Sequence, residues 1–208
     1  MTEARGKFIT VEGVEGVGKS TNISLIAELI REAGHEVVLT REPGGTQLAE
    51  RVRDILLDKA EHGMTPMAEL LLMFASRAQH VEELIQPALE QGKWVVCDRF
   101  TDSSYAYQGG GRDMGDEPVS ALEELTLGEF RPDLTLILDL DVATGLGRAT
   151  ATTEADRFES EAQEFFEKVR AAFHRRAASS DRYRVIDASG TLEEVQTEIR
   201  ALMSEVLR

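Results

Sequence analysis

The sequence predicts an α/β fold in which a five-stranded parallel sheet is flanked by helices on both faces. Two observations support this prediction. Five short apolar runs have the length of strands that are buried on both faces, and helical patterns separate them. Such alternation favours a parallel sheet whose ligands gather at the carboxyl ends of the strands. Because 208 residues with 42% hydrophobic content suffice for one core, we expect a single domain over residues 1–208.

The elements follow from local patterns along the chain. Ile23, Ile26 and Ile30 share one helical face in a segment that ends at Gly34, directly after the first β-rich run and a glycine-rich loop. The expected strands are KFITVE (7–12), HEVVLT (35–40), KWVVCD (93–98), DLTLILDL (133–140) and RYRVIDA (182–188). The expected helices include residues 20–34, 46–58 and a largely continuous helix over 66–91. Residues 148–158 lack an apolar stripe, which suits a mobile flap.

The composition of the chain argues against several classes of binding partner. The net charge of −15 disfavours attraction to a nucleic acid polymer or an anionic membrane, so anionic ligands would need a local cluster of loop arginines. No apolar stretch approaches the roughly 18 residues that span a bilayer, and we expect a cytoplasmic protein. The single cysteine, Cys97, lies in an apolar run and is assigned no chemistry.

A phosphate-binding loop is the most specific local motif. Gly13, Gly18, Lys19 and Ser20 have the G-x-x-x-x-G-K-[ST] spacing, after a strand and at the start of a helix. The glycines let backbone amides face an anion, Lys19 can reach the β- and γ-phosphates, and the Ser20 hydroxyl can bind Mg²⁺. We expect the nucleotide to contact Gly13, Val14, Glu15, Gly16, Val17, Gly18, Lys19, Ser20 and Thr21.

Absent motifs narrow the class of protein further. A guanine-specific switch normally carries N-K-x-D, but Asn22 is the only asparagine. Partitioning-type ATPases carry an extra lysine near the start of the loop, where this chain has Val14. A motor ATPase usually needs a longer chain. A kinase fits better than any of these three classes.

The chain resembles the bacterial thymidylate kinases over nearly its whole length. The resemblance rests on VEGVEGVGKST, TREPGGTQLAE, LLLMFASRAQH, DRFTDSSYAYQGGGR, FRPDLTLILDLD and DASGTLEEV. It implies a nucleoside monophosphate kinase-like fold with a short lid at about 148–158, and a homodimer formed through the apolar faces of the long helices. The implied reaction transfers the γ-phosphate of ATP to dTMP with Mg²⁺, giving dTDP and ADP in dTTP synthesis.

The resemblance also implies an acceptor pocket. Phe74 would stack on thymine, although a core aromatic is the alternative, and Arg77, one helical turn on, would donate to thymine O4 and reject cytosine. Ser104 would contact the base near N3, Tyr107 would exclude a 2′-hydroxyl, and Arg99 would hold the acceptor phosphate. The full expected dTMP-binding set is Glu15, Glu42, Pro43, Phe74, Arg77, Arg99, Ser104, Tyr107 and Gln108.

The roles of three charged positions are not decided by the sequence: the metal ligand, the partner of Arg41 and the function of Glu15. Asp98 ends a strand and could hold Mg²⁺ with Ser20, but Asp139 also ends a strand and competes for that role. Arg41 either contacts a ligand or pairs with Glu42. Glu15 matches a family acidic residue near the acceptor's 3′-hydroxyl and phosphate. It need not act as a base, because a phosphate monoester with a second pKa near 6 is already mostly a dianion.

The lid departs from the family pattern. Thr150 and Thr152 stand where bacterial relatives commonly carry arginines, so only Arg148 and Arg157 remain. We expect Arg157 to serve the transferring phosphate and Arg148 the adenine or phosphates of ATP, unless they pair with adjacent acidic residues. The expected catalytic set is Lys19, Arg99, Arg157 and Glu15. The alternatives are another nucleoside monophosphate kinase, or a nucleotide-dependent binding protein that has lost phosphoryl transfer.

Overall fold

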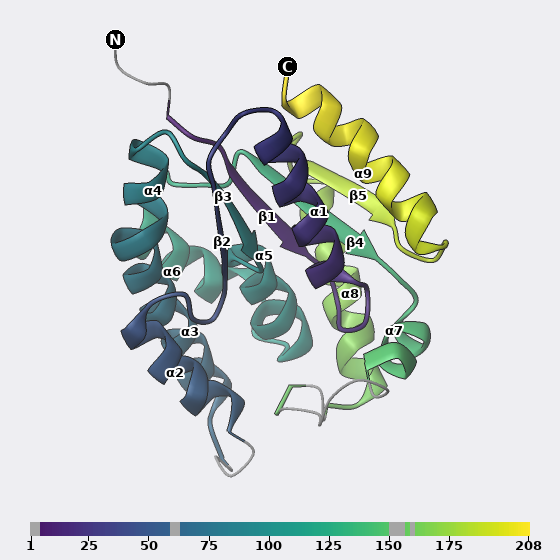
Figure 1. Cartoon of the computed structure of the whole chain (residues 1–208). Coiled ribbons are helices and arrows are strands. Elements are labelled where there is room, and N and C mark those ends of the chain that lie inside the picture. The colour runs from purple at the N-terminus through teal and green to yellow at the C-terminus, as the bar shows by residue number, and fades with distance from the viewer. Residues whose placement is uncertain (1–4, 59–62, 150–156, 159–160) are drawn as a thin grey trace.

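The sheet has five parallel strands in the order β2-β3-β1-β4-β5, as the sequence predicts. The structure is a computed structural model that describes residues 5–58, 63–149, 157–158 and 161–208 (Figure 1). The strands are β1 (Phe8–Glu12), β2 (Val37–Arg41), β3 (Trp94–Asp98), β4 (Leu134–Asp139) and β5 (Tyr183–Asp187).

Strand β1 lies at the centre of the sheet, and all five of its residues are buried. Val11 lies opposite Asp98 of β3 and Leu136 of β4. The carboxyl ends of these three strands therefore meet at one edge of the sheet, where parallel strands gather their ligands. Glu12, Asp98 and Asp139 end them.

Helices cover both faces of the sheet. Helices α1 and α9 lie on one face, and α5 and α8 lie on the other (Figure 1). The helices are α1 (Lys19–Glu32), α2 (Gln47–Leu57), α3 (Pro66–His80), α4 (Gln86–Glu90), α5 (Thr101–Ser104), α6 (Asp116–Leu127), α7 (Val142–Ala149), α8 (Gln163–Ala177) and α9 (Leu192–Val206). None of the described helices is long and apolar enough to cross a bilayer.

The predicted long helix over residues 66–91 is present and nearly continuous. Helix α3 begins at Pro66 behind the N-cap Thr65, whose side chain accepts a hydrogen bond from the Ala68 N–H at 3.3 Å. A π-helical segment, Val81–Ile85, then joins α3 to α4. A second π-helical segment, Tyr105–Gly111, follows α5. Such segments often mark functional sites, and this one carries Tyr107 and Gln108.

A buried carboxylate fastens α5 to α8 and β5. Asp102 is fully buried and accepts hydrogen bonds from Arg176 Nε at 2.8 Å and from the Tyr183 hydroxyl at 2.8 Å. Arg182 Nη2 lies 3.1 Å from its other oxygen. Because an unpaired buried charge is costly, these partners hold the segment that follows β3 in one position.

Candidate active site

The phosphate loop connects β1 to α1. Gly18 caps α1 in a left-handed conformation, with φ of 85°, and Lys19 is the first helical residue. Gly16 also has a positive φ of 72°, and a Cβ there would lie 2.0 Å from the Gly145 carbonyl oxygen on α7. The loop therefore packs so closely against α7 that only glycine fits at this position. Its amides and the start of α1 form an anion-binding site.

Lys19 reaches back across the loop. Its ammonium donates to the carbonyl oxygens of Gly13 at 3.2 Å and Val14 at 3.1 Å. Burial away from water, together with the nearby positive charge of Arg99, lowers the Lys19 pKa to about 8. Bound phosphates would favour the charged ammonium.

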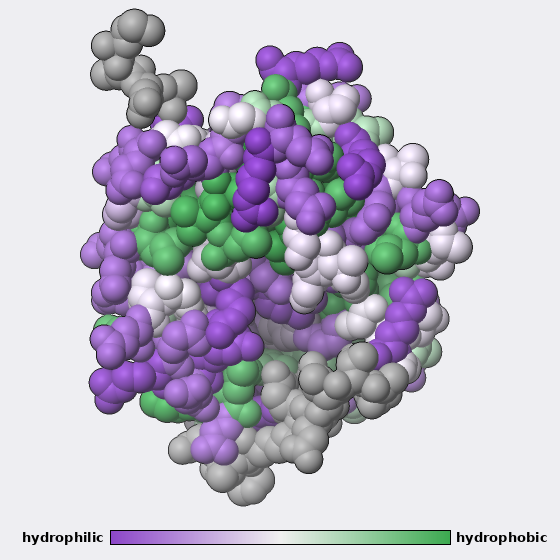
Figure 2. All heavy atoms as spheres, viewed as in Figure 1, coloured by the Kyte–Doolittle hydropathy of each residue, from purple (hydrophilic) through white to green (hydrophobic). Residues whose placement is uncertain are grey.

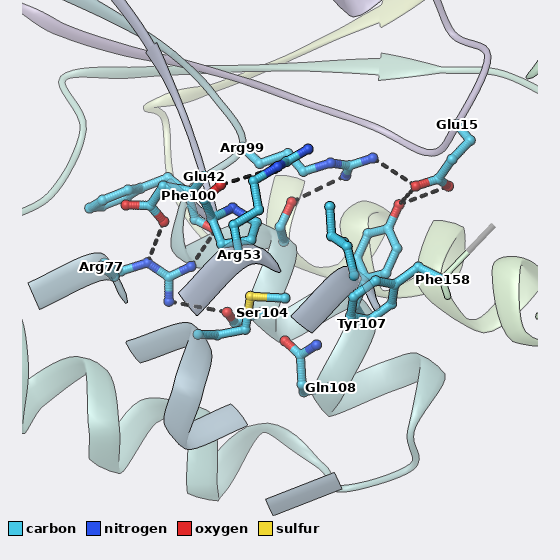
Figure 3. Close-up of a pocket in the computed structure, with 14 residues that line it drawn as sticks. Glu15, Glu42, Arg53, Arg77, Arg99, Phe100, Ser104, Tyr107, Gln108 and Phe158 are labelled. Carbon is cyan, nitrogen blue, oxygen red and sulfur yellow. Dashed lines mark hydrogen bonds and ion pairs between the residues drawn. The ribbon is translucent and has the colours of Figure 1, made fainter. Parts of the chain in front are cut away.

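Arg99 links the phosphate loop to the segment after β3. Its guanidinium donates to the Gly13 carbonyl at 3.0 Å and to Glu15 at 2.9 Å. The Tyr107 hydroxyl donates to the same Glu15 carboxylate at 2.7 Å (Figure 3). Burial alone would lower the Arg99 pKa, but Tyr107 and Glu15 outweigh it and the pKa is raised. The structure thus brings Glu15 together with Arg99 and Tyr107, which follow it in the sequence by 84 and 92 positions.

A cavity of about 550 Å³ begins at this cluster and extends toward α2 and α3. The molecular surface is hollowed there, between the lower end of α1 and helix α2 (Figure 2). Its lining includes eight of the nine residues expected to bind the acceptor: Glu15, Glu42, Pro43, Arg77, Arg99, Ser104, Tyr107 and Gln108.

Phe74 is the ninth expected residue, and it does not line this cavity. Its side chain is 2% exposed and packs with Leu70, Tyr105 and Val119. The Arg77 guanidinium lies 4.5 Å from the centre of its ring. The ring therefore supports Arg77 from behind, and Met73 on the same helix lines the cavity instead.

Arg77 is held in a fixed orientation. Its Nε donates to Glu42 at 2.7 Å, Nη1 to the Ser104 hydroxyl at 3.1 Å, and Nη2 to the Phe100 carbonyl at 3.1 Å. Glu42 also lies 3.1 Å from His80 Nδ1. Arg77 is 2% exposed and Glu42 4% exposed, so the pair is shielded from water. One end of the cavity therefore carries a rigid donor.

The suggested pairing of Arg41 with Glu42 is wrong. Arg41 forms a two-pronged pair with Glu50 on α2, at 3.0 and 2.9 Å. Glu42 instead turns inward to Arg77, on the opposite side of the chain. Successive residues of an extended segment face opposite directions, which separates the two neighbours.

The two candidate metal ligands differ in their surroundings. Asp139 is bound by Arg170 through two hydrogen bonds, at 2.7 and 2.8 Å, and by His174 at 3.1 Å. The hydrogen bond with Arg170 keeps the Asp139 pKa below its usual value. Asp98 Oδ1 is buried and accepts no hydrogen bond from the described residues. Of the two, Asp98 has the oxygen that a cation could satisfy.

The lid lies only partly within the described residues. Thr150 and Thr152 fall outside them. Arg148 on α7 donates to the Ala188 carbonyl at 3.4 Å, just after β5. Arg157 donates to the Leu56 carbonyl at 2.8 Å, and its Nη2 lies 2.6 Å from Glu69 on α3. In this arrangement Arg157 contacts the acceptor side of the cleft, at α2 and α3.

Several lining residues were not anticipated. They are Arg53, Leu57, Met73, Phe100, Ser103 and Phe158. The sequence contained a signal for Met73, which lies four residues before Arg77. Around a helix, residues four apart differ in direction by about 40°, whereas residues three apart, such as Phe74 and Arg77, differ by about 60°. It is therefore nearer than Phe74 to the direction of Arg77. Arg53 and Phe158 come from distant segments, and nothing local in the sequence marks them.

Glu12, the last residue of β1, is a buried carboxylate beneath the site. It accepts hydrogen bonds from the Phe100 N–H at 2.7 Å and the Ser103 hydroxyl at 2.6 Å. Burial, with Asp102 nearby, raises its pKa to about 8. The folded protein thus binds a proton at Glu12 that the unfolded chain, with a carboxyl pKa near 4.5, releases.

The unfolding free energy should therefore fall as pH rises from about 5 to 8, and this loss should level off above pH 8. Glu12→Gln should flatten that slope, because its neutral amide binds no proton. Urea unfolding at pH 5, 6.5 and 8 would measure it. The exposed Glu28→Gln on α1 is the control and should keep the wild-type slope. An unchanged slope in Glu12→Gln would contradict the raised pKa.

The fold and the site define a phosphate-loop kinase that acts on a small acceptor in the adjoining cleft. The sequence model of the family described as thymidylate kinase matches residues 11–199. The chain belongs to the thymidylate kinase family. It is a nucleotide-binding phosphotransferase, and the alternative of a protein that has lost phosphoryl transfer is not favoured.

Individual relatives agree with this family. The thymidylate kinase of Ectopseudomonas mendocina (strain ymp) is 56% identical over 203 residues, which covers 97% of each chain. That of Pseudomonas fluorescens (strain Pf0-1) is 57% identical with the same coverage. The crystal structure of thymidylate kinase from Ehrlichia chaffeensis superposes with a TM-score of 0.78 at 35% identity, covering 96% of this chain and 99% of that one.

Proposed function

We propose that this protein transfers the γ-phosphate of ATP to dTMP, giving dTDP and ADP. The observation that carries this proposal is a single cleft with two chemically different ends. Arg77 and Ser104 form one end, and Arg99 lies at the other, beside the phosphate loop. A planar base and a phosphate on one small molecule match these two ends.

The base end favours thymine through donors. Arg77 can only donate, so it suits the 4-oxo group of thymine and opposes the 4-amino group of cytosine. Met73 lines the cavity where a base would lie, whereas Phe74 is covered by the Arg77 guanidinium. We therefore propose that Met73 packs on the thymine face and that Phe74 positions Arg77. Tyr107 would lie against the sugar and leave no room for a 2′-hydroxyl.

The phosphate end favours a monoester dianion. Arg99 offers a planar fork of donors, a good match for phosphate oxygens. Its present partners, Gly13 and Glu15, place that fork at the junction of the cleft and the phosphate loop. Because the acceptor dianion needs no deprotonation, we propose that Glu15 orients Arg99 and Tyr107. The acceptor oxygen would then be aligned with the γ-phosphorus of ATP.

ATP would lie along the phosphate loop with its phosphates on the amides at the start of α1. Lys19 would neutralise the charge that develops on the transferring phosphoryl group. Ser20 and Asp98 supply hard oxygen ligands of the kind that Mg²⁺ prefers, and the unsatisfied Asp98 Oδ1 fits a cation. Arg148, which contacts the chain after β5, would face the adenine or its phosphates.

Arg157 is assigned to the transferring phosphate when both nucleotides are bound. To do this it must leave Glu69, which it contacts at 2.6 Å. Arg157→Ala should lower kcat by about 100-fold, the size typical for one lost transition-state donor. The Kd for dTMP should change much less.

Steady-state kinetics and calorimetric titration of dTMP would separate these two effects. The matched control is Arg175→Ala, which removes an exposed arginine on α8. Its kcat should equal that of the wild type. An unchanged turnover number in Arg157→Ala would remove Arg157 from the catalytic set.

The wider organisation is also part of the proposal. The whole chain would act as one cytoplasmic kinase unit with a lid over about 148–158. It would work as a homodimer through α2 and α3, which lie side by side (Figure 1). Leu48 and Ile55 on α2 and Met67 and Leu71 on α3 are between 46% and 49% exposed, an unusual level for four large apolar residues on neighbouring helices.

An assay of ADP release tests the proposed reaction. It would contain ATP, Mg²⁺ and one acceptor at a time, chosen from dTMP, dUMP, dCMP, dGMP, AMP, CMP and UMP. Arg77 and Tyr107 lead us to expect a clear preference for dTMP over dCMP, dGMP, AMP, CMP and UMP, whereas dUMP shares the 4-oxo group and the deoxyribose of dTMP. Preference for another monophosphate would support a different kinase of this fold. Binding of ATP without turnover of any acceptor would support a nucleotide-dependent binding protein.

A further inference from the structure

Glu69 on α3 is a buried carboxylate that the proposed mechanism does not use. It is 1% exposed, yet three side chains contact it. Gln108 Nε2 donates to its Oε1 at 2.8 Å, Arg112 Nε and Nη2 donate at 3.3 and 3.2 Å, and Arg157 Nη2 lies 2.6 Å from Oε2. A buried carboxylate is tolerated only when it is paired in this way. The contacts with Gln108 and Arg112 hold Glu69 in place even when Arg157 moves to the transferring phosphate.

This carboxylate determines which way the Gln108 amide faces. A side-chain amide has a donor end and an acceptor end, whereas a carboxylate paired with arginines can only accept. The amide nitrogen of Gln108 is therefore held toward Glu69, and its oxygen must face elsewhere. Gln108 lines the acceptor cavity, and its oxygen lies on the side of Ser104 (Figure 3). No described side chain or backbone group donates to that oxygen.

We propose that Glu69 is a positioning residue for acceptor selection: it holds Gln108 with the amide oxygen toward the base, where that oxygen accepts a hydrogen bond from a pyrimidine N3–H. This inference rests on the proposed function, and it names which edge of the base is recognised. Thymine carries the N3–H donor. Cytosine has a bare acceptor nitrogen at N3, which would face the Gln108 oxygen without a proton between them.

Arg77 and Gln108 would then read adjacent atoms with opposite requirements. Arg77 donates to a 4-oxo group, and Gln108 accepts from N3–H. A cytosine-type base fails at both atoms and leaves buried polar groups unpaired, which is an effective means of rejection. Arg77 alone would recognise only the group at C4. By orienting Gln108, Glu69 would add recognition of N3 without contacting the substrate itself.

The experiment compares dTMP with 5-methyl-dCMP, which differ only at N3 and C4. The ratio of their kcat/KM values would be measured for the wild type and Glu69→Gln. The introduced glutamine has a donor of its own, so the Gln108 amide can turn and present its NH2 group to N3 of 5-methylcytosine. We expect the ratio to fall at least tenfold, partly through a gain for 5-methyl-dCMP.

Glu161→Gln is the matched control. Glu161 is the other carboxylate paired with Arg112, at its Nη1, so the control changes the same arginine. Among the described residues, Glu69 is the one carboxylate that Gln108 contacts, so the control should leave the amide in place. Its ratio should equal that of the wild type. A purely structural role for Glu69 would lower both kcat/KM values equally and leave the ratio unchanged, which would overturn the proposal.

Gln108→Leu provides a second variant in case Glu69→Gln does not fold. It removes the acceptor oxygen but leaves the carboxylate, and dTMP should lose at least tenfold in kcat/KM while 5-methyl-dCMP changes little. Equal losses for the two substrates would overturn the inference. A wild type that phosphorylates neither nucleotide would instead overturn the proposed function, so the two failures are distinguishable.

Discussion

Replacing Lys19 with methionine should lower kcat for dTMP phosphorylation by about 100- to 1000-fold, the cost of losing one preorganised transition-state donor. Methionine keeps the length and packing of the side chain but removes its charge. The lysine ammonium lies over the phosphate loop, within 3.2 Å of two of its carbonyl oxygens. Since phosphoryl transfer depends on positioning and charge neutralisation, this loss should appear mainly in kcat.

Single-turnover kinetics with saturating ATP and dTMP would measure the chemical step in Lys19→Met. The control is Lys93→Met, which removes a lysine from a surface pair with Glu36 at 3.2 Å. Such exposed pairs contribute little, so the control should retain wild-type turnover. Retention of more than about a tenth of the wild-type rate in Lys19→Met would contradict the role of Lys19.

Replacing Arg99 with alanine should have the second large effect, of about 1000-fold on kcat/KM for dTMP. Loss of a bidentate charged contact in a desolvated site accounts for about 100-fold, and the misplaced acceptor adds to it. The Kd for ATP should change much less, because Arg99 lies on the acceptor side of the phosphate loop. Steady-state kinetics with each substrate varied in turn would measure this difference.

Arg99→Lys separates charge from geometry at this position. Lysine keeps the charge but lacks the planar fork, so its kcat/KM for dTMP should lie between those of the wild type and Arg99→Ala. Both variants keep a side chain at the positive φ of 67°, so backbone strain is similar in the two. If ATP affinity collapsed while the KM for dTMP stayed constant, Arg99 would belong to the donor site instead.

Local sequence patterns were sufficient where a single motif specifies both chemistry and conformation. The loop from Gly13 to Ser20 requires glycines for its turns and a lysine for its charge, so its place between β1 and α1 was predictable. The five strands were predictable for a similar reason, because short runs buried on both faces have few alternatives.

Side-chain partners that depend on the path of a loop were not predictable. Arg41 was expected either to contact a ligand or to pair with Glu42, but it binds Glu50, because the chain turns after Arg41 and brings the start of α2 back. Phe74 was expected to face the ligand and instead packs behind Arg77. Both Met73 and Phe74 lie about one turn from Arg77, and the small difference in their directions, which favours Met73, is a weak signal in the sequence.

Buried carboxyl groups were the least visible feature of the sequence. Glu12 and Glu69 occur in an apolar strand and an amphipathic helix, where a carboxylate is normally expected on the surface. Their partners, Ser103 and Gln108, come from the segment after β3 and are more than 35 residues away. Only the folded arrangement shows that these carboxylates position the residues that line the cleft.

We infer that one cleft selects dTMP and delivers it to the phosphate loop. The most direct test is a competition in which ATP labelled at the γ-phosphate is incubated with Mg²⁺, the protein and an equimolar mixture of dTMP, dUMP, dCMP, dGMP and AMP. Chromatography of the products identifies the acceptor. We expect label in dTDP well above dCDP, dGDP and ADP, and label spread evenly over these products or gathered in one of them would contradict the selection of dTMP.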